Sequence, residues 1–311
     1  MHYIHLMKIL YFCIVLLVGV PLLAQQPKQL QLFPQGTVFH QNIRYANDTS
    51  QKHLLDIYLP PNTGSNTRGA SSAIPLVVWI HGGAWMLNDK YADMGYMKNT
   101  VKRFIDSGYA LASINYRYST DSVFPAPIRD CNAAIEYLYQ HANTYGIDKN
   151  KIAVIGFSAG GHLASLLTLS NNNHVPEFSA TPVHFRIRTC LDFYGPSDFI
   201  MLANNPDTAV NNMRNPVSIL LGALAVDRPD LAKRASPVTY IDKDDPPFLI
   251  VQGEKDESVP NTQSKILHAW LDLNGVPNDL IIVPNAPHYG EMFDAEYIRK
   301  KVFEYLREYL R

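Results

Sequence analysis

Short apolar runs alternate with amphipathic stretches along most of the chain. Strands are predicted where apolar residues run together between turn formers, at residues 76–80, 109–114, 152–155, 187–193, 248–251 and 280–283. Helices are predicted where apolar residues recur every three or four positions, at residues 94–106, 127–145, 162–169, 262–273 and 295–310. Buried strands that alternate with helices favour a largely parallel sheet covered by helices on both faces.

Two earlier runs have a different character. Residues 37–45 and 54–59 are strand-like and flank a turn-rich segment, residues 46–52, so we expect an antiparallel hairpin at one edge of the sheet. Residues 62–73 are rich in Asn, Ser, Thr and Gly, a composition typical of an exposed loop.

Residues 199–245 interrupt the alternation. Several short helix-like pieces are separated by prolines, at Pro206, Pro216, Pro229 and Pro237. Because this segment lies between two sheet strands, it must sit outside the core layers. We expect a small cap insertion near the carboxyl ends of the strands, where ligands bind in such sheets.

The first 24 residues are typical of a signal peptide. Lys8 precedes an apolar run at residues 9–20, and Ala24 marks a small-residue cleavage site before a polar stretch. The run is shorter than the roughly 20 residues that span a bilayer, and Cys13 lies inside it, which disfavours a retained anchor and a lipoprotein. We therefore expect a signal peptide at 1–24, a linker at 25–36 and one catalytic domain at 37–311. The mature protein would be secreted or periplasmic, without a stable membrane anchor.

Composition narrows the classes of partner. Hydrophobic residues make up 47% of the chain and charged residues 18%, which is typical of a folded globular protein. The formal net charge is −1 and no basic stripe is present, so we expect no nucleic-acid partner. No zinc spacing, P-loop or dinucleotide fingerprint is found, so no metal or cofactor is expected. Cys131 and Cys190 remain either a disulfide or two buried free thiols.

The strongest chemical motif is GFSAGG, centred on Ser158. It follows the strand predicted at 152–155 and precedes the helix predicted at 162–169, which is the context of a nucleophile elbow. Glycines two positions before and after the serine permit a tight turn that exposes its hydroxyl. A helix that begins there directs backbone N–H groups and partial positive charge at the same point. Ser158 is the predicted nucleophile.

A second motif, HGGAW at residues 81–85, follows the strand predicted at 76–80. It matches the glycine-rich oxyanion loop that accompanies such a nucleophile, with Ala84 where a third glycine often stands. Small residues let the substrate carbonyl approach backbone donors. We expect the oxyanion hole to consist of the N–H groups of Gly83, Ala84 and Ala159, with Gly82 as an alternative donor. His81 is expected to hold the loop.

Two later loops supply the remaining catalytic candidates. Asp256 follows the strand at 248–251, and its role would be to orient a histidine; Glu254 and Glu257 are close rivals. His288 follows the last strand, between Pro287 and Gly290, where it is well placed as a general base. The chain order Ser158, Asp256, His288 is that of the α/β-hydrolase triad.

With these residues the chain resembles the α/β-hydrolase superfamily, in its esterase and lipase branch. HGGAW, GFSAGG, the segment FYGPSD at 193–198 and the Asp256 loop resemble bacterial secreted acetyl-xylan and feruloyl esterase-like proteins. The resemblance implies acyl esters on plant cell-wall carbohydrate as substrates.

Other residues near the motifs carry less specific interpretations. Trp85 either lines the acyl pocket or packs under the oxyanion loop, and Tyr194 either edges the substrate pocket or belongs to the core. Arg129 and Asp130 are interpreted as a structural ion pair or as helix-start residues.

The sequence predicts a serine esterase that cleaves short acyl esters of a small-molecule or carbohydrate alcohol. Three alternatives stay open. A formamidase-type amidase would use the same triad, a lipase would act on micellar substrates, and a binding protein would keep the scaffold without the reaction.

Overall fold

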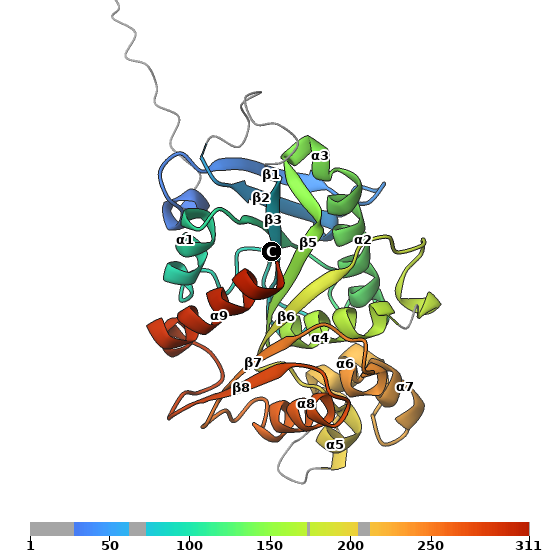
Figure 1. Cartoon of the computed structure of the whole chain (residues 1–311). Coiled ribbons are helices and arrows are strands. Elements are labelled where there is room, and N and C mark those ends of the chain that lie inside the picture. Colours follow the sequence, from blue (N-terminus) through green and yellow to red (C-terminus); the bar gives the residue numbers. More distant parts are fainter. Residues whose placement is uncertain (1–27, 62–72, 173–174, 205–211, 311) are drawn as a thin grey trace, which may run out of the picture.

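The computed structural model describes residues 28–61, 73–172, 175–204 and 212–310 (Figure 1). The signal peptide expected at 1–24 lies outside these residues, so export stays a prediction. Within the described ranges, no helix combines the length and apolar character needed to cross a membrane.

The core is an eight-stranded sheet with the order β1-β2-β4-β3-β5-β6-β7-β8. The strands are β1 (Val38–Arg44), β2 (Leu54–Leu59), β3 (Ile74–Ile80), β4 (Ala110–Ile114), β5 (Ile147–Phe157), β6 (Ile187–Phe193), β7 (Phe248–Gly253) and β8 (Asn278–Val283). β1 pairs with β2, and β2 with β4, in antiparallel register, whereas the remaining pairs are parallel. The predicted parallel sheet with an antiparallel hairpin at its edge is confirmed.

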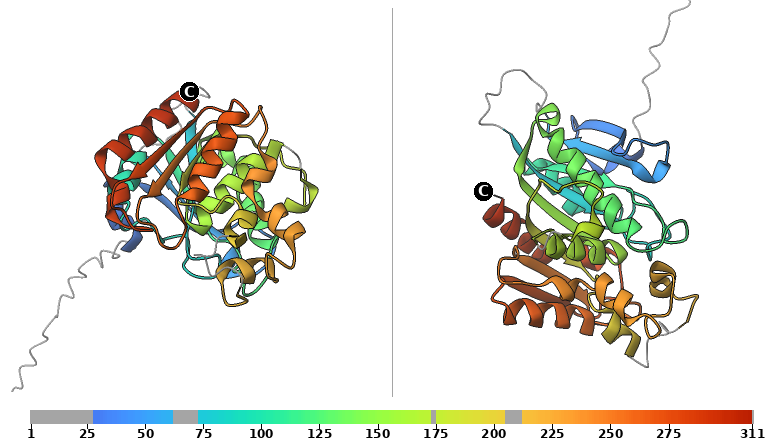
Figure 2. Two further views of the ribbon diagram at one scale, coloured as in Figure 1. Left: turned by 90° about the horizontal axis from the view of Figure 1, so that it is seen from below. Right: turned by 90° about the vertical axis from the view of Figure 1, so that its right-hand side faces the viewer.

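Helices cover both faces of this sheet (Figures 1 and 2). They are α1 (Lys98–Asp106), α2 (Ala126–Gln140), α3 (Ala142–Tyr145), α4 (Ala159–Asn172), α5 (Phe199–Asn204), α6 (Pro216–Leu221), α7 (Pro229–Ala235), α8 (Thr262–Leu273) and α9 (Glu296–Tyr309). α1 and α9 share one apolar cluster, in which Phe104 lies 5.2 Å from Phe303 between ring centroids. α2, α4 and α8 contribute to the cluster on the other face.

β3 illustrates why the central strands are apolar on both sides. Successive side chains of a strand point to opposite faces. Val78 and Ile80 therefore join the cluster under α2 and α4, whereas Val77 and Trp79 join the cluster under α1 and α9. All four side chains are fully buried. A strand covered on both faces needs a continuous apolar run, which is the pattern the sequence offers.

The expected cap lies between β6 and β7 and comprises α5, α6, α7 and a short 3₁₀ helix, Pro237–Tyr240. In Figure 1 these helices lie beside α8. Asn215 caps α6 through a hydrogen bond from the Val217 N–H, and Gly222 ends the helix with a φ of 69°. The Ser236 hydroxyl accepts the Phe199 N–H at 2.9 Å, which ties the end of α7 to the start of α5.

Several boundaries differ from the prediction for identifiable reasons. The helix expected from residue 94 begins at Lys98, because residues 94–97 form turns. The helix expected over 127–145 is divided at His141 into α2 and α3. β5 begins at Ile147, five residues before the expected start at residue 152, because it pairs there with Ile74.

Part of the linker expected at residues 25–36 packs on the sheet, since Phe33 is buried and stacks on Tyr58 with centroids 4.0 Å apart.

Cys131 on α2 and Cys190 on β6 are both free and buried. The disulfide alternative is therefore wrong, and both thiols act as small apolar groups.

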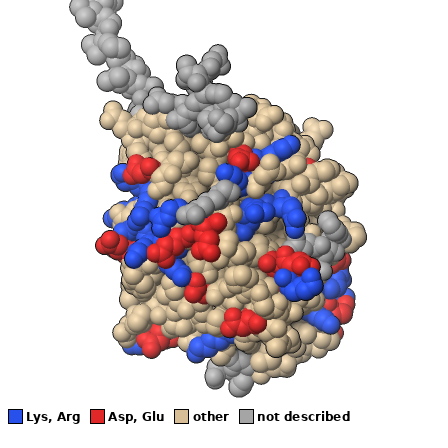
Figure 3. Space-filling view, viewed as in Figure 1, with Lys and Arg blue, Asp and Glu red and all other residues tan. Residues whose placement is uncertain are grey.

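Acidic and basic side chains are interspersed on the face that carries α9 (Figure 3). Lys301 on α9 contacts Asp279 on β8 at 2.8 Å, and Lys300 contacts Glu304 at 3.9 Å one helical turn away. Charges of both signs that pair locally leave no extended basic field on this face.

Candidate active site

Ser158 occupies a strained turn between β5 and α4. Its φ is +53°, a left-handed value that non-glycine residues rarely adopt. A Cβ on Gly156 would lie 2.1 Å from the Gly160 carbonyl oxygen, and a Cβ on Gly160 would lie 2.1 Å from the Ile80 carbonyl oxygen. Only glycine fits at either position. The Ser158 N–H donates to the Phe193 carbonyl at 2.9 Å, which anchors the turn to β6.

Ser158, His288 and Asp256 form one continuous chain of hydrogen bonds. The Ser158 Oγ lies 2.8 Å from His288 Nε2, and His288 Nδ1 lies 2.7 Å from Asp256 Oδ2. Because a carboxylate only accepts hydrogen bonds, the Nδ1 atom carries the proton and Nε2 is left as the acceptor for the serine hydroxyl. The fold thus brings together two residues that are 130 positions apart in the sequence.

Both oxygen atoms of the Asp256 carboxylate accept hydrogen bonds. Oδ1 accepts the backbone N–H groups of Ser258 and Val259 at 2.9 and 2.8 Å. Oδ2 accepts from His288 and from the Gln252 side chain, the latter at 2.8 Å. The Asp256 side chain is fully buried, so these bonds fix the direction in which it faces His288.

The two rivals of Asp256 lie elsewhere. The Glu254 carboxylate accepts the Asn285 N–H at 2.8 Å and is exposed. Glu257 is also exposed. Only Asp256 of the three contacts His288.

The oxyanion loop after β3 is tightly curved. Gly83, Ala84 and Trp85 all have positive φ, at 119°, 54° and 59°. The Gly82 N–H donates to the Asp93 carboxylate at 2.8 Å. It is therefore not available as the alternative donor to an oxyanion. By contrast, the hydrogen bonds found in the described part of the chain do not use the N–H groups of Gly83, Ala84 and Ala159.

Residues 116–119, which follow β4, form hydrogen bonds to the backbone of this loop. The Tyr116 hydroxyl donates to the His81 carbonyl, and the Ser119 N–H donates to the Trp85 carbonyl, both at 2.8 Å. The His81 ring stacks on Tyr116 with centroids 4.4 Å apart. Burial lowers the pKa of His81 to about 4, which keeps its ring neutral at neutral pH. This agrees with a supporting role for His81.

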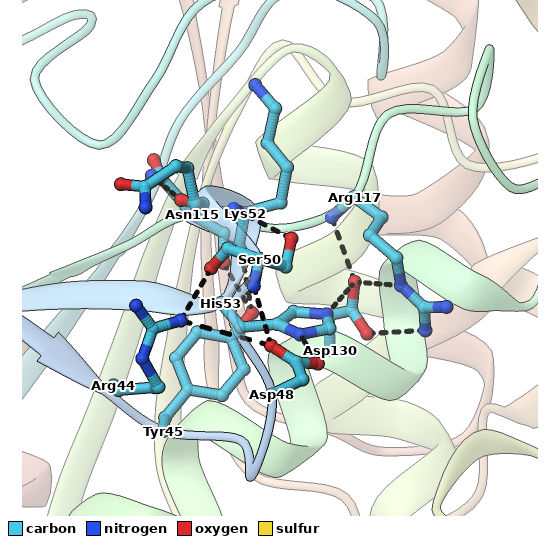
Figure 4. A network of polar contacts seen from close by, with 10 residues as sticks. Arg44, Tyr45, Asp48, Ser50, Lys52, His53, Asn115, Arg117 and Asp130 are labelled. Carbon is cyan, nitrogen blue, oxygen red and sulfur yellow. Dashed lines mark hydrogen bonds and ion pairs between the residues drawn. The ribbon is translucent and has the colours of Figure 1, made fainter.

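A network of polar side chains, shown in Figure 4, holds Arg117 of this segment in place. Arg117 makes a bidentate contact with Asp130, with N–O distances of 2.7 and 2.8 Å. The His53 ring lies between Asp130, at 3.3 Å, and Asp48, at 2.5 Å. Arg129 and Asp130 do not pair with each other, because Arg129 donates instead to the Glu177 carbonyl; both lie near the start of α2, as the other interpretation expected.

Trp85 lies between the cavity and the interior of the fold. It lines the cavity above Ser158, yet its side chain is almost fully buried. Its indole N–H donates to His162 Nδ1 at 3.1 Å. Since indole is only a donor, the His162 proton lies on Nε2, which donates to the Ala235 carbonyl at 2.7 Å. Burial lowers the pKa of His162 to about 4, and this neutral ring links the oxyanion loop to the cap.

Sequence reasoning missed a second carboxylate beside the triad. Asp93 accepts from the Tyr96 hydroxyl at 2.6 Å, and Tyr96 contacts the Tyr194 hydroxyl at 2.8 Å. The Tyr194 ring is buried and lies 5.0 Å from the His288 ring between centroids. Burial raises the pKa of Asp93. No motif marks Asp93, which is eleven positions from the Gly82 N–H that it holds.

A cavity of about 1280 Å³ opens over the triad. Apolar residues of the oxyanion loop and the cap line it, among them Trp85, Leu202 and Val217. Tyr96 and Tyr289 line it beside His288. The cap thus contributes directly to the cavity wall, as its expected place near the strand ends implied.

Comparisons with known proteins agree with this geometry. Esterase LipQ of Mycobacterium tuberculosis is 30% identical over 254 residues, which are 79% of this chain and 58% of LipQ. The probable carboxylic ester hydrolase LipM of the same organism is 31% identical over 259 residues, which are 81% of this chain and 56% of LipM. The chain thus spans little more than half the length of these curated relatives.

Two solved structures have the same fold. One is a truncated carbohydrate esterase from gut microbiota, with a TM-score of 0.76 and 29% identity over 89% of this chain and 98% of its own. The other is a bifunctional GH43-CE protein of Bacteroides eggerthii, with a TM-score of 0.77 and 32% identity over 88% of this chain and 35% of its own. The family model BD-FAE matches residues 55–271, from β2 to α8 and including the cap. By this match the chain belongs to the BD-FAE family of α/β-hydrolase esterases.

Proposed function

We propose that this protein is a serine carboxylic-ester hydrolase that releases short acyl groups, of acetyl or feruloyl type, from carbohydrate esters. The observation that carries the proposal is the chain of hydrogen bonds from Asp256 through His288 to Ser158, at 2.7 and 2.8 Å, on the wall of a large cavity. The esterase relatives and the two carbohydrate-esterase structures support the same reaction class.

In the acylation step, His288 Nε2 takes the proton from the Ser158 hydroxyl while Oγ forms a bond to the ester carbonyl carbon. The carbonyl electron pair moves to oxygen, where the N–H groups of Gly83, Ala84 and Ala159 stabilise the negative charge. When the intermediate collapses, the bond to the alcohol oxygen breaks. That oxygen takes the proton from Nε2 and leaves as the alcohol.

Deacylation repeats these steps with water. Water gives a proton to His288 Nε2 as its oxygen attacks the acyl-enzyme carbonyl. Ser158 Oγ then leaves and recovers the proton, and the carboxylic acid is released. Asp256 stays ionised and balances the imidazolium charge in both half-reactions.

The test is acid release from nitrophenyl acetate, butyrate and octanoate, methyl ferulate, acetylated xylan and an acetyl anilide. Wild type is compared with Ser158→Ala and with Ser107→Ala, a matched loss of an exposed hydroxyl at the end of α1. Ser158→Ala should lose almost all ester cleavage, on the order of 10⁶-fold in kcat, whereas Ser107→Ala should match wild type.

Other outcomes would replace the proposal. Cleavage of the anilide with no ester cleavage would favour an amidase, and a rate increase only above the micelle concentration of the octanoate would favour a lipase. If wild type neither cleaves any substrate nor reacts with a fluorophosphonate probe, the binding-protein alternative takes its place.

We also propose that the chain is exported and cleaved after Ala24. The support is the apolar run at residues 9–20 behind Lys8. N-terminal sequencing of the protein from its native host should begin at Gln25. An N-terminus at Met1 would contradict export with cleavage.

A further inference from the structure

We propose that Tyr289, backed by Tyr96, forms an aromatic platform that binds the sugar ring bearing the scissile ester. This inference rests on the proposed function and specifies where its alcohol part lies. It assigns a role to the most exposed aromatic side chain that lines the cavity.

The chemistry of the reaction fixes the side of the cavity to which the sugar belongs. His288 Nε2 must deliver a proton to the departing alcohol oxygen, so the alcohol part lies next to His288. Tyr289 directly follows His288 in the chain. Its ring lies 6.2 Å from the histidine ring between centroids and is nearly perpendicular to it, at 85°.

Tyr289 is far more exposed than Trp85, another aromatic residue of the cavity lining. It is 65% exposed, whereas Trp85 is 3% exposed. The Tyr96 ring lies 6.2 Å from Tyr289, tilted by 39°, and its hydroxyl is held by Asp93 and by Tyr194. One ring is therefore fixed and the other is open to a ligand, and both line the same cavity.

The surroundings favour a sugar over an aliphatic alcohol. The faces of aromatic rings carry partial negative charge and attract the electropositive C–H groups of a pyranose ring. Asn88 and Glu257 are exposed and line the same cavity, and they offer an amide and a carboxylate to hydroxyl groups. A long aliphatic chain would instead favour apolar lining residues such as Leu202 and Val217 of the cap.

The experiment compares two acetate esters that differ only in their alcohol: acetylated xylo-oligosaccharides and ethyl acetate. Acetate release gives kcat/KM for each, and the ratio of the two values reports selectivity for the sugar. The variants are Tyr289→Ala, Tyr289→Phe and the control Tyr297→Ala, which removes another exposed ring, at 51%, that does not line the cavity.

Tyr289→Ala should lower the selectivity ratio by roughly three- to tenfold, the value of one lost ring contact. Tyr289→Phe keeps the ring and should retain most of the ratio, and Tyr297→Ala should not change it. An unchanged ratio in Tyr289→Ala would overturn the platform while leaving the esterase proposal intact. If wild type cleaves only ethyl acetate, both the platform and the carbohydrate substrate are wrong, and if it cleaves neither ester, the proposed function itself fails.

Discussion

The two walls of the cavity are held in place in different ways. The wall formed by loops after β3, β5 and β7 contains strained backbone at Ser158 and Ala84, and its Asp256 carboxylate has four hydrogen-bond partners. The cap wall consists of short helices that present apolar side chains such as Leu202 and Val217. In the proposed function, the first wall positions the reacting atoms and the second borders the space in which we expect the acyl group. Changes to the first should therefore reduce catalysis of every ester, whereas changes to the second should alter which ester is preferred.

After loss of the nucleophile itself, the largest effect is expected from Asp256→Asn. The amide can donate to His288 Nδ1, which favours the tautomer with its proton on Nε2, where it cannot accept from Ser158. We expect kcat to fall about 10⁴-fold on all esters. Steady-state kinetics on nitrophenyl acetate give the value. Glu254→Gln is the matched control, because its amide oxygen can still accept the Asn285 N–H, and it should retain wild-type rates. Equal losses in both variants would remove Asp256 from the triad.

Asp93→Asn tests the support of the oxyanion loop. The carboxylate accepts from both the Gly82 N–H and the Tyr96 hydroxyl, whereas an amide offers only one acceptor atom. The loop should shift, and misplaced donors should lower kcat by about 10- to 100-fold with little change in KM. If instead KM rises and kcat is unchanged, Asp93 contributes to substrate binding and does not position the loop.

A cap substitution should change selectivity. Val217→Ala enlarges the cavity beside the cap, where we expect the acyl group, so the ratio of kcat/KM for butyrate over acetate should rise by roughly tenfold, the usual value of one methylene in an apolar pocket. The measurement uses the two nitrophenyl esters side by side. A parallel loss on both esters would show that the cap also positions the reacting groups, and the contrast between the walls would then break down.

The smallest effect is expected on the free energy of unfolding, from a change at His53 in the polar network shown in Figure 4. The contact with Asp130, followed by that with Asp48, raises the pKa of His53 above 6.5. A raised pKa means that the charged ring stabilises the folded state fully below pH 6.5, and that this contribution is lost as pH rises through the folded pKa. His53→Gln should therefore lower the free energy of unfolding more at pH 6 than at pH 9. Urea unfolding at both values measures the difference, and an equal loss at both would contradict a charged His53.

The sequence indicated the sheet and the triad candidates because both depend on local signals. Strands such as β3 are continuous apolar runs, and Ser158 lies in a turn whose glycines are required because an added Cβ would lie 2.1 Å from a backbone carbonyl oxygen. Asp93 and His162 gave no such signal. Their roles arise from contacts between segments far apart in the chain, such as the bond of His162 to the Ala235 carbonyl 73 positions away. The start of α1 was misjudged because residues 94–97 carry helical spacing in the sequence but form turns in the structure.

The central claim is that Ser158 carries the acyl group during turnover. The most direct measurement is rapid acid quenching of wild type with acetylated xylo-oligosaccharides, followed by peptide mass spectrometry. We predict an acetyl ester on the peptide that contains Ser158, formed in wild type and absent from Ser158→Ala. Release of acetate by wild type with acetyl found on another residue, or continued release by Ser158→Ala, would contradict the account.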